Sequence, residues 1–370
     1  GVEMRRIMMR GHIRTFCTRN NVPQNISSKI GTNLHLTKNH PLNLIKTRIE
    51  SVFSDYVAVD DLDPVVSAQR NFDDLLVPKD HVSRSKSDTF YVDEDTVLRT
   101  HTSAHQTELI QKGHDRFLCT GDVYRRDTVD ASHYPVFHQM EGVRVFKHDE
   151  IDPRQNRQSA VKEVSEHLQS RLERMIRSVF GDVEVRWVDA YFPFTDPSYE
   201  MEIYFQDEWL EVLGCGVIEQ DILRKAGRGD EIGWAFGLGL ERLAMVLYGI
   251  PDIRLFWSQD PRFLNQFETG SNDIKFESFS KYPPCLKDVS FWITPEFHEN
   301  DIHDAARTVA GDLVENVSLI DNFTHPKNGK TSHCYRITYR SMERSLLNEE
   351  IDELQLKLRD AVVEMGCDLR

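Results

Sequence analysis

Cysteine and long apolar runs are both scarce in this sequence. Its 370 residues include six cysteines, and no two of them form a CxxC pair. This scarcity argues against a zinc ribbon or a disulfide framework and favours a reducing compartment. No apolar run approaches the ~18 residues that a helix needs to span a bilayer. We therefore expect no membrane partner and no dedicated transition-metal site.

Positive charge is also in short supply, with a formal net charge of −15 at pH 7. Bulk charge does not decide nucleic-acid binding, because a local cationic face is sufficient. The first 50 residues are locally basic, with nine Lys/Arg against two Glu. Met4–Arg19 has no acidic residue and places arginines among apolar residues, which is typical of a mitochondrial presequence. A basic arm that touches RNA is the alternative.

The length allows two or three domains, and the 39% hydrophobic and 28% charged contents describe an ordinary globular protein. Helical spacing of apolar residues predicts helices over Asn39–Tyr56 and Gln158–Phe180. Alternation of apolar and polar residues then predicts antiparallel strands. These strands are Val183–Val188, Met201–Phe205 and Glu208–Gly214. Residues 60–95, rich in Asp, Lys and Ser, are expected to be irregular.

A second domain is expected after a polar linker at residues 268–276. The patterns beyond it predict strand, helix, strand, strand, helix and a short end, which is the split βαβ order. The expected elements are Lys287–Ile293, Asn300–Ala310, Leu313–Ile320, Ser332–Arg340 and Asn348–Met365. The whole chain is therefore expected to be of the α+β class.

One stretch combines arginines, an aromatic ring and acidic groups in a fixed order. It runs through Thr120–Asp127 and, after a polar loop, through Phe137–Gly142. The pattern predicts a strand with a cationic end, an exposed loop and a returning strand. Arginine offers a planar fork for phosphate oxygens, an aromatic ring can stack on a base, and Gln with Glu can hold an ammonium group. These parts could place a nucleotide phosphate beside an amino acid.

This stretch resembles motif 2 of the class II aminoacyl-tRNA synthetases, and its FHQMEG segment is similar to that of the phenylalanine enzymes. Gly233–Arg242 resembles motif 3 of the family, and Asn39–Asn43 opens a helical run as motif 1 does. Lys281–Pro284 resembles the start of the ferredoxin-fold anticodon-binding domain of phenylalanyl-tRNA synthetases. The resemblance implies a basic arm at 1–32, a class II antiparallel sheet flanked by helices at 33–267, and a ferredoxin-like βαββαβ domain at 277–370.

The resemblance implies roles for the residues of an ATP site. Arg125 matches the arginine on the α-phosphate, where a fixed guanidinium stabilises the charge that grows during attack. A surface salt bridge to a neighbouring aspartate, which is worth little, is the alternative. Arg242 matches the arginine on the γ-phosphate. His133 and Phe137 match further ATP contacts, with the Phe137 ring stacked on adenine.

The amino-acid site is expected on the returning strand. Gln139 and Glu141 are two residues apart and so project from one face of it. The resemblance implies that His101, Ser103 and Gln106, from the THTSAHQ element, reach the same ammonium and carboxylate groups. His101 is expected to position the substrate and not to titrate, because the attacking carboxylate is already ionised.

By the same resemblance, Phe192 and Phe194 hold the substrate phenyl ring edge-on, although their pattern alone fits sheet core equally well. Ala235 matches a small residue whose size sets the depth of the pocket. Two polar residues received no site role. His138 is expected near the site without substrate contact, or at the surface, and Arg126 is expected to be structural.

The reaction implied is ATP-dependent ligation of L-phenylalanine to tRNA(Phe) through a phenylalanyl-adenylate. ATP should bring Mg²⁺, for which Glu211 is the candidate ligand and Glu200 and Glu202 are alternatives. The resemblance is to the single-chain organellar form, which implies a monomer in the mitochondrial matrix. Cations on one C-terminal hairpin are candidates for tRNA contact. They are His325, Lys327, Lys330, Arg336, Arg340 and Arg344.

Two rival functions remain at this stage. One is a synthetase-like RNA-binding or regulatory protein that has kept the fold and lost the chemistry. Loss of Arg125, Gln139, Glu141 or Arg242 would have indicated this, and all four are present. The other is a synthetase for a different amino acid, against which the FHQMEG, YFPF and KYPP segments argue together.

Overall fold

The computed structural model describes residues 20–271, 273–278, 282–327 and 329–370. The presequence-like segment Met4–Arg19 therefore lies outside the described residues, and so does Lys281. Among the described residues, no helix is both long enough and apolar enough to cross a membrane.

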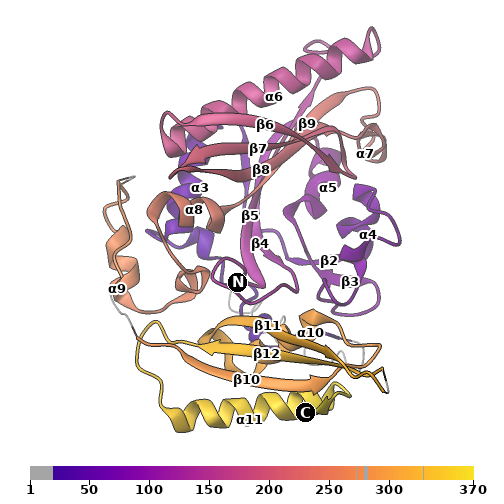
Figure 1. The fold of residues 1–370 in the computed structure, drawn as a ribbon. Coiled ribbons are helices and arrows are strands. Elements are labelled where there is room, and N and C mark those ends of the chain that lie inside the picture. Colours follow the sequence, from indigo (N-terminus) through magenta and orange to yellow (C-terminus); the bar gives the residue numbers. More distant parts are fainter. Residues whose placement is uncertain (1–19, 272, 279–281, 328) are drawn as a thin grey trace, which may run out of the picture.

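The larger domain is built on a seven-stranded sheet in the order β1-β4-β5-β9-β8-β7-β6 (Figure 1). Adjacent strands of this sheet are antiparallel, except that β1 and β4 are parallel. The strands are β1 (Val57–Val59), β4 (Arg116–Tyr124), β5 (Val136–Phe146), β6 (Glu184–Phe192), β7 (Thr195–Phe205), β8 (Glu208–Ile218) and β9 (Ile232–Gly239). A turn at Gln206 and Asp207, both with positive φ, joins β7 to β8.

Helices cover both faces of this sheet because its strands alternate apolar side chains between two cores. On β4, Leu118 belongs to one core, and Phe117 and Cys119 belong to the other. Helices α3 (Pro41–Val52), α6 (Arg157–Phe180) and α8 (Leu240–Tyr248) pack on the first core. Helices α5 (Gln106–Gln111) and α7 (Gln220–Lys225) pack on the second.

Helix α6 begins where its sequence predicts. The Asn156 side chain accepts a hydrogen bond from the backbone N–H of Ser159 at 3.0 Å, which caps the first turn. The apolar stripe expected over Gln158–Phe180 is fully buried at Leu168, Leu172 and Ile176. The helix therefore ends, at Phe180, where its stripe ends.

The expectation that residues 60–95 are irregular is wrong in part. Within them β2 (Val65–Ser67) pairs antiparallel with β3 (Thr96–Leu98), and α4 (Ala68–Asn71) follows directly. Phe72 and Leu75 are buried in the second core. Three-residue strands are too short to show an alternating pattern, which is why the sequence did not reveal them.

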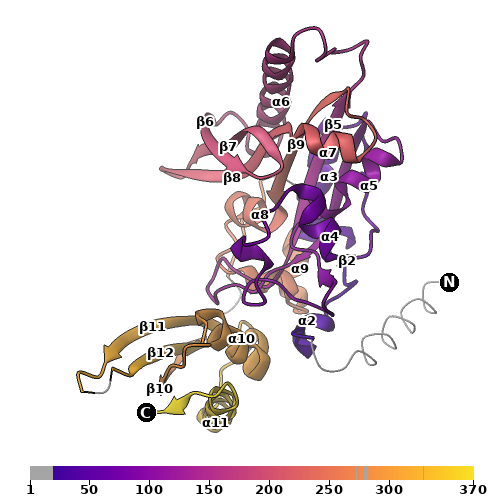
Figure 2. The same ribbon diagram turned by 90° about the vertical axis from the view of Figure 1, so that its right-hand side faces the viewer.

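The C-terminal domain has the expected order of elements. They are β10 (Cys285–Trp292), α10 (Glu299–Ala310), β11 (Val314–Thr324), β12 (Thr331–Tyr339), α11 (Asn348–Glu364) and β13 (Asp368–Leu369). The sheet order is β11-β12-β10-β13. Helices α10 and α11 pack against each other and share one apolar core with the sheet (Figure 2).

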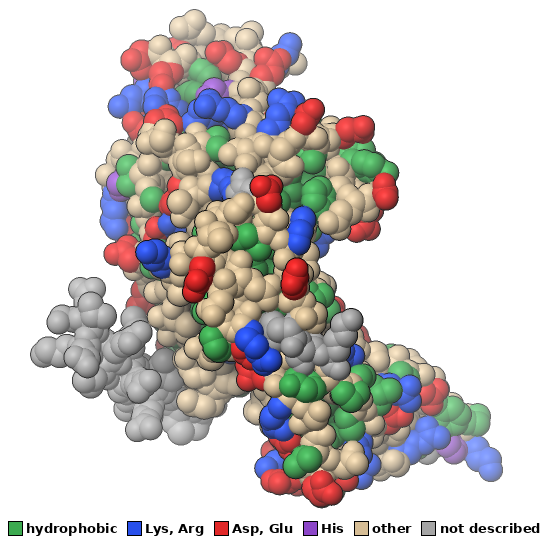
Figure 3. Space-filling view, turned by 90° about the vertical axis from the view of Figure 1, so that its left-hand side faces the viewer, with side chains coloured by type: hydrophobic (Ala, Val, Ile, Leu, Met, Phe, Trp, Pro, Cys, Tyr) green, Lys and Arg blue, Asp and Glu red, His purple; other side chains and the backbone are tan. Residues whose placement is uncertain are grey.

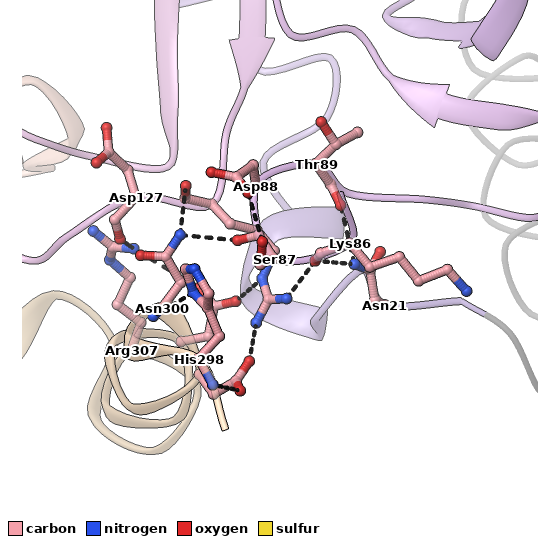
Figure 4. A network of polar contacts seen from close by, with 12 residues as sticks. Asn21, Lys86, Ser87, Asp88, Thr89, Asp127, His298, Asn300 and Arg307 are labelled. Carbon is pink, nitrogen blue, oxygen red and sulfur yellow. Dashed lines mark hydrogen bonds and ion pairs between the residues drawn. The ribbon is translucent and has the colours of Figure 1, made fainter. Parts of the chain in front are cut away.

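The two domains meet where α10 packs against the loop between β4 and β5, residues 125–135, which we call the motif 2 loop. Arg126 forms ion pairs with Asp301 and Asp304 of α10, so its structural role is confirmed. Arg307 donates to the backbone oxygen of Asp127 at 2.6 Å. Asn300 donates to the backbone oxygens of Ser87 and Arg126 at 2.9 and 3.4 Å. Figure 4 shows this network.

The segments before and after the larger domain both pack against it. Helix α2 (Gln24–Ser27) places Ile26 in the first core and Asn25 within hydrogen-bond distance of the Arg307 backbone oxygen. The folded part of the chain thus begins before residue 33, inside the expected basic arm. After α9 (Pro261–Leu264), the expected linker returns to the domain, where the N–H of Phe276 donates to the Tyr248 oxygen at 2.7 Å.

Candidate active site

A cavity of about 790 Å³ opens over one end of β4, β5, β8 and β9. In Figure 3 the molecule is hollowed between the upper domain and the C-terminal domain. All the site residues expected from the sequence, apart from Gln106, line this cavity. They are His101, Ser103, Arg125, His133, Phe137, Gln139, Glu141, Phe192, Phe194, Glu211, Ala235 and Arg242. Residues from five separate segments are thereby brought together.

Arg125 leaves β4 at the start of the motif 2 loop and is held without a carboxylate partner among the described residues. Its Nε donates to the Thr100 backbone oxygen at 2.9 Å, and its guanidinium lies 5.1 Å from the centre of the Phe137 ring. Asp122 pairs with Arg99 instead. The salt bridge weighed as an alternative is therefore absent, and the remaining guanidinium N–H groups can meet a ligand.

Arg242 adds positive charge to the same cavity, and His133 lines it as well. Arg242 lies in the first turn of α8, and its Nε donates to the Glu211 backbone oxygen at 2.8 Å. The hydrogen bond of His133 with Asp130, at 2.7 Å, raises the pKa of His133 above its ordinary value. With Arg125, these groups surround a space that suits a polyphosphate.

The amino-acid side of the cavity lies on β5, where Gln139 is opposite Gly239 and Glu141 is opposite Gly237 of β9. Gln139 Oε1 accepts from the Thr102 backbone N–H at 3.1 Å. Glu141 is 2% exposed, and burial raises its pKa to about 8 despite the opposing effect of the Ser103 hydroxyl. Neither Glu141 oxygen has a cationic partner among the residues that the structure describes, and an ammonium group of a ligand would be one.

His101 lines the same cavity, and its pKa is lowered to about 3 by burial and, second, by the charge of Arg125. The imidazole is therefore neutral near pH 7, which suits a residue that positions substrate. Gln106 is buried at 2% exposure behind the turn, and both polar atoms of its amide lack a partner among the described residues. Its contact with substrate stays a prediction.

Two aromatic rings form the apolar part of the cavity. Phe192 ends β6 and Phe194 lies in the turn before β7, with ring centres 5.9 Å apart and planes inclined by 13°. Gly214 of β8 makes room for Phe192, because a Cβ there would lie 2.7 Å from the ring Cζ. Ala235 of β9 adds a small buried side chain to the lining. The apolar wall that these side chains form suits the edge of a flat apolar group.

One carboxylate, that of Glu211, stands at the rim of the cavity, and those of Glu200 and Glu202 on β7 do not line it. Glu211 of β8 is exposed there and lies opposite Glu202 of β7, which is paired with Arg186. Burial, followed by the charges of Glu211 and Glu202, raises the pKa of Glu200. Hard oxygen donors of this kind fit Mg²⁺. No group of three or more His, Cys, Asp or Glu arranged to hold a metal ion occurs in the part of the chain that the structure describes. The Glu211 carboxylate therefore suits a metal ion whose other ligands would come from a bound phosphate.

The sequence did not reveal two buried polar contacts next to the site. His138 is completely buried and pairs with Glu241, so its alternative placement at the surface was wrong. Arg99 is buried against Asp122. Each contact joins residues far apart in the chain, and neither leaves a local pattern. For the His138–Glu241 contact, the available signal was the position of Glu241 directly before Arg242 in motif 3.

Comparison with known families agrees with this geometry. Residues 23–267 match the family model "tRNA synthetases class II core domain (F)", and residues 280–370 match "Ferredoxin-fold anticodon binding domain". The chain therefore belongs to the class II aminoacyl-tRNA synthetases. The expected α+β fold, with a class II core and a ferredoxin-like domain, is confirmed.

Individual relatives narrow the resemblance further. The chain is 57% identical over 357 residues to an Arabidopsis thaliana protein named phenylalanine–tRNA ligase, chloroplastic/mitochondrial, covering 95% of this chain and 83% of the relative. It is 52% identical to the mitochondrial phenylalanine–tRNA ligase of Dictyostelium discoideum, covering 92% and 87%. The mouse mitochondrial enzyme is 50% identical, covering 93% and 84%. These names agree with the activity and the organelle expected from the sequence.

Proposed function

We propose that this chain ligates L-phenylalanine to tRNA(Phe), using ATP and forming phenylalanyl-adenylate as an intermediate. The observation that carries the proposal is one cavity with three neighbouring parts. Cationic groups line it at Arg125 and Arg242, a buried carboxyl lies at Glu141, and aromatic walls stand at Phe192 and Phe194. The relatives named above support phenylalanine as the amino acid.

In the first step, the carboxylate of phenylalanine attacks the α-phosphorus of ATP and pyrophosphate leaves. Arg125, fixed by the Thr100 oxygen, donates to the non-bridging oxygens, where negative charge grows in the transition state. Phe137 offers its ring to adenine, and Arg242 and His133 hold the leaving phosphates. No general base is needed, which agrees with the lowered pKa of His101.

Glu141 and Gln139 would orient the amino acid. The ammonium group supplies the cation that the buried Glu141 lacks, so the carboxyl ionises when phenylalanine binds. Gln139 is held by the Thr102 N–H and can accept from the same ammonium. This arrangement directs the substrate carboxylate toward the nucleotide and the phenyl ring toward Phe192 and Phe194.

Mg²⁺ bound with ATP would neutralise phosphate charge, and Glu211 at the rim is the protein carboxylate proposed to hold it. The Glu211 backbone oxygen meanwhile accepts from Arg242 Nε. The backbone of this residue thus fixes the γ-phosphate arginine, while its side chain remains exposed to the cavity.

The ferredoxin-fold domain would hold the anticodon region of the tRNA. Lys, Arg and His side chains gather at the far tip of this domain in Figure 3. Arginines nearer its middle are already paired with acidic groups, so a phosphate would have to compete for them. These pairs are Arg336–Asp288, Arg340–Glu315 and Arg344–Glu350. A monomer acting in the mitochondrial matrix completes the proposal, which the mitochondrial relatives support.

Charging of a tRNA(Phe) transcript with radiolabelled phenylalanine tests the proposal. The Arg125→Ala variant, purified in parallel, should form adenylate about 10²–10³-fold more slowly, the usual loss for a transition-state donor. It also controls for a contaminating host synthetase. Tight tRNA binding without charging by the unaltered chain would instead support the RNA-binding alternative.

A further inference from the structure

Arg99 is a buried cation that contacts three separate segments next to the cavity. It follows β3 directly and is 1% exposed. Its Nε and Nη2 donate to the backbone oxygen and Oδ1 of Asp122 at 2.7 and 2.8 Å. Its Nη1 donates to the Leu62 oxygen at 3.2 Å and to His105 Nε2 at 2.9 Å. A guanidinium has no acceptor, so His105 receives this bond as a neutral imidazole.

The surroundings of Arg99 admit little movement. Asp122 also accepts from the Tyr124 hydroxyl, so both of its carboxylate oxygens are used. The Tyr124 N–H donates to the Arg99 backbone oxygen at 2.9 Å. At Gly121 an added Cβ would lie 2.0 Å from Arg99 Nη2, so glycine is required there for the guanidinium to reach Asp122.

The contacts of Arg99 lie between the two halves of the site. On the nucleotide side, its neighbour Thr100 accepts from Arg125 through the backbone oxygen, and Asp122 belongs to the strand that carries Arg125. On the amino-acid side, His105 ends a short turn that His101 precedes and that contains Ser103. Gln106 follows the turn directly. Arg99 does not line the cavity and can act only through these residues.

We propose that Arg99 is a positioning residue for adenylate formation, which fixes Arg125, directly after β4, relative to the turn at residues 101–106. This inference rests on the proposed function. A buried ion pair is weak evidence for stability, since a well-packed apolar pair often serves the fold as well. This pair instead supplies placement, because Arg99 joins Asp122, three residues before Arg125, to His105 at the end of the turn.

Arg99→Lys tests the inference. Lysine keeps the charge and can reach Asp122, but its single ammonium cannot bridge Asp122, Leu62 and His105. Because a misplacement of about 1 Å can cost about 10²-fold in rate, kcat/KM for phenylalanine-dependent pyrophosphate exchange should fall by roughly that factor. The loss should include a lower kcat and a higher KM for both phenylalanine and ATP, at equal concentrations of active sites.

Arg144→Lys is the matched control. Arg144 lies on β5, is 5% exposed and pairs with Glu150, but it does not line the cavity or contact the residues named above. Thermal unfolding of both variants reports any general loss of stability. If Arg99 is only structural, both variants will keep wild-type KM values and lose activity in proportion to their unfolded fraction, and that result would overturn the proposal.

Gly121→Ala provides a second test, which also applies if Arg99→Lys does not fold. The added methyl displaces the guanidinium from Asp122 and leaves every charged group in the chain. It should raise both KM values and lower kcat as Arg99→Lys does, and wild-type constants would contradict the inference. Absence of exchange by the unaltered chain would instead refute the proposed function.

Discussion

His138 and Glu241 form a buried pair that joins motif 2 to motif 3. The ring Nδ1 of His138 lies 2.7 Å from Glu241 Oε1, and the His138 backbone N–H donates to Oε2 at 2.8 Å. Their side chains are 0% and 3% exposed. Gln139 follows the histidine and Arg242 follows the glutamate, so this contact fixes the residue proposed to hold the amino acid relative to the residue proposed to hold the nucleotide.

Glu241→Gln should destabilise the fold without a change in side-chain volume. The glutamine amide has one acceptor oxygen, whereas the carboxylate accepts from both His138 donors. The imidazole N–H must then face an NH₂ group or move to the buried Nε2, which has no partner among the described residues, so one buried donor is unsatisfied in either tautomer. Leaving such a group unsatisfied costs about 1–3 kcal/mol. Urea unfolding measures the loss, with the exposed Glu163→Gln as control. Equal unfolding free energies for the two variants would show that the buried pair contributes nothing.

Glu141 makes the stability of the empty enzyme depend on pH. Its pKa is raised from 4.5 to about 8, so the folded chain keeps a proton that the unfolded chain releases. Stability therefore falls as pH rises through this window. In the Glu141→Gln variant, the free energy of unfolding should lose this pH dependence, which amounts to a change on the order of a few kcal/mol across the window. The variant should also bind phenylalanine more weakly. Urea unfolding across the window, with and without phenylalanine, measures both. An unchanged slope would contradict the assignment.

Arg126→Ala should loosen the contact between the two domains. Arg126 and Asp304 are 12% and 13% exposed at the side chain, and removal of one partner of a buried pair costs on the order of 3–5 kcal/mol. Faster proteolytic cleavage within residues 268–276 would report the loosened contact. The control is Arg344→Ala, which removes the more exposed pair with Glu350, where an effect under about 1 kcal/mol is expected. Equal cleavage rates would show that the Arg126 pairs do not hold the domains together.

Ala235→Val should shorten the pocket for the phenyl ring. Ala235 is 6% exposed and lines the cavity, so two added methyl groups must occupy substrate space. The KM for phenylalanine should rise while the KM for ATP stays near its wild-type value. In the unaltered chain, tyrosine should still be activated slowly, because an apolar pocket rejects an added hydroxyl by only about 10²-fold. A higher KM for ATP in Ala235→Val would show a wider disturbance than pocket filling.

Regular elements with strong periodicity could be predicted from the sequence, and short ones could not. The apolar stripe of α6 located that helix to within one residue at its start. The βαββα order of the C-terminal domain followed from patterns of similar strength. Strands β2 and β3 have three residues each, and their pairing depends on tertiary contact that no local pattern records.

In the candidate site too, residues within a sequence motif could be predicted, and residues defined by tertiary contacts could not. Arg125, Gln139, Glu141 and Arg242 were found through motifs, and the cavity brings them together. Arg99 and His138 were missed because their partners lie 23 and 103 residues away. Burial of a polar side chain is a property of the folded chain, so an arginine after a short strand looks like any surface cation in the sequence.

ATP–pyrophosphate exchange with each of the twenty amino acids tests the central claim most directly. The account predicts exchange that depends on phenylalanine, with a trace for tyrosine, because it assigns the phenyl ring to the aromatic wall at Phe192 and Phe194 and the ammonium group to Glu141. Exchange that depends on a different amino acid would contradict the assignment of the pocket. No exchange with any of them, by folded protein that binds ATP, would contradict the proposed chemistry.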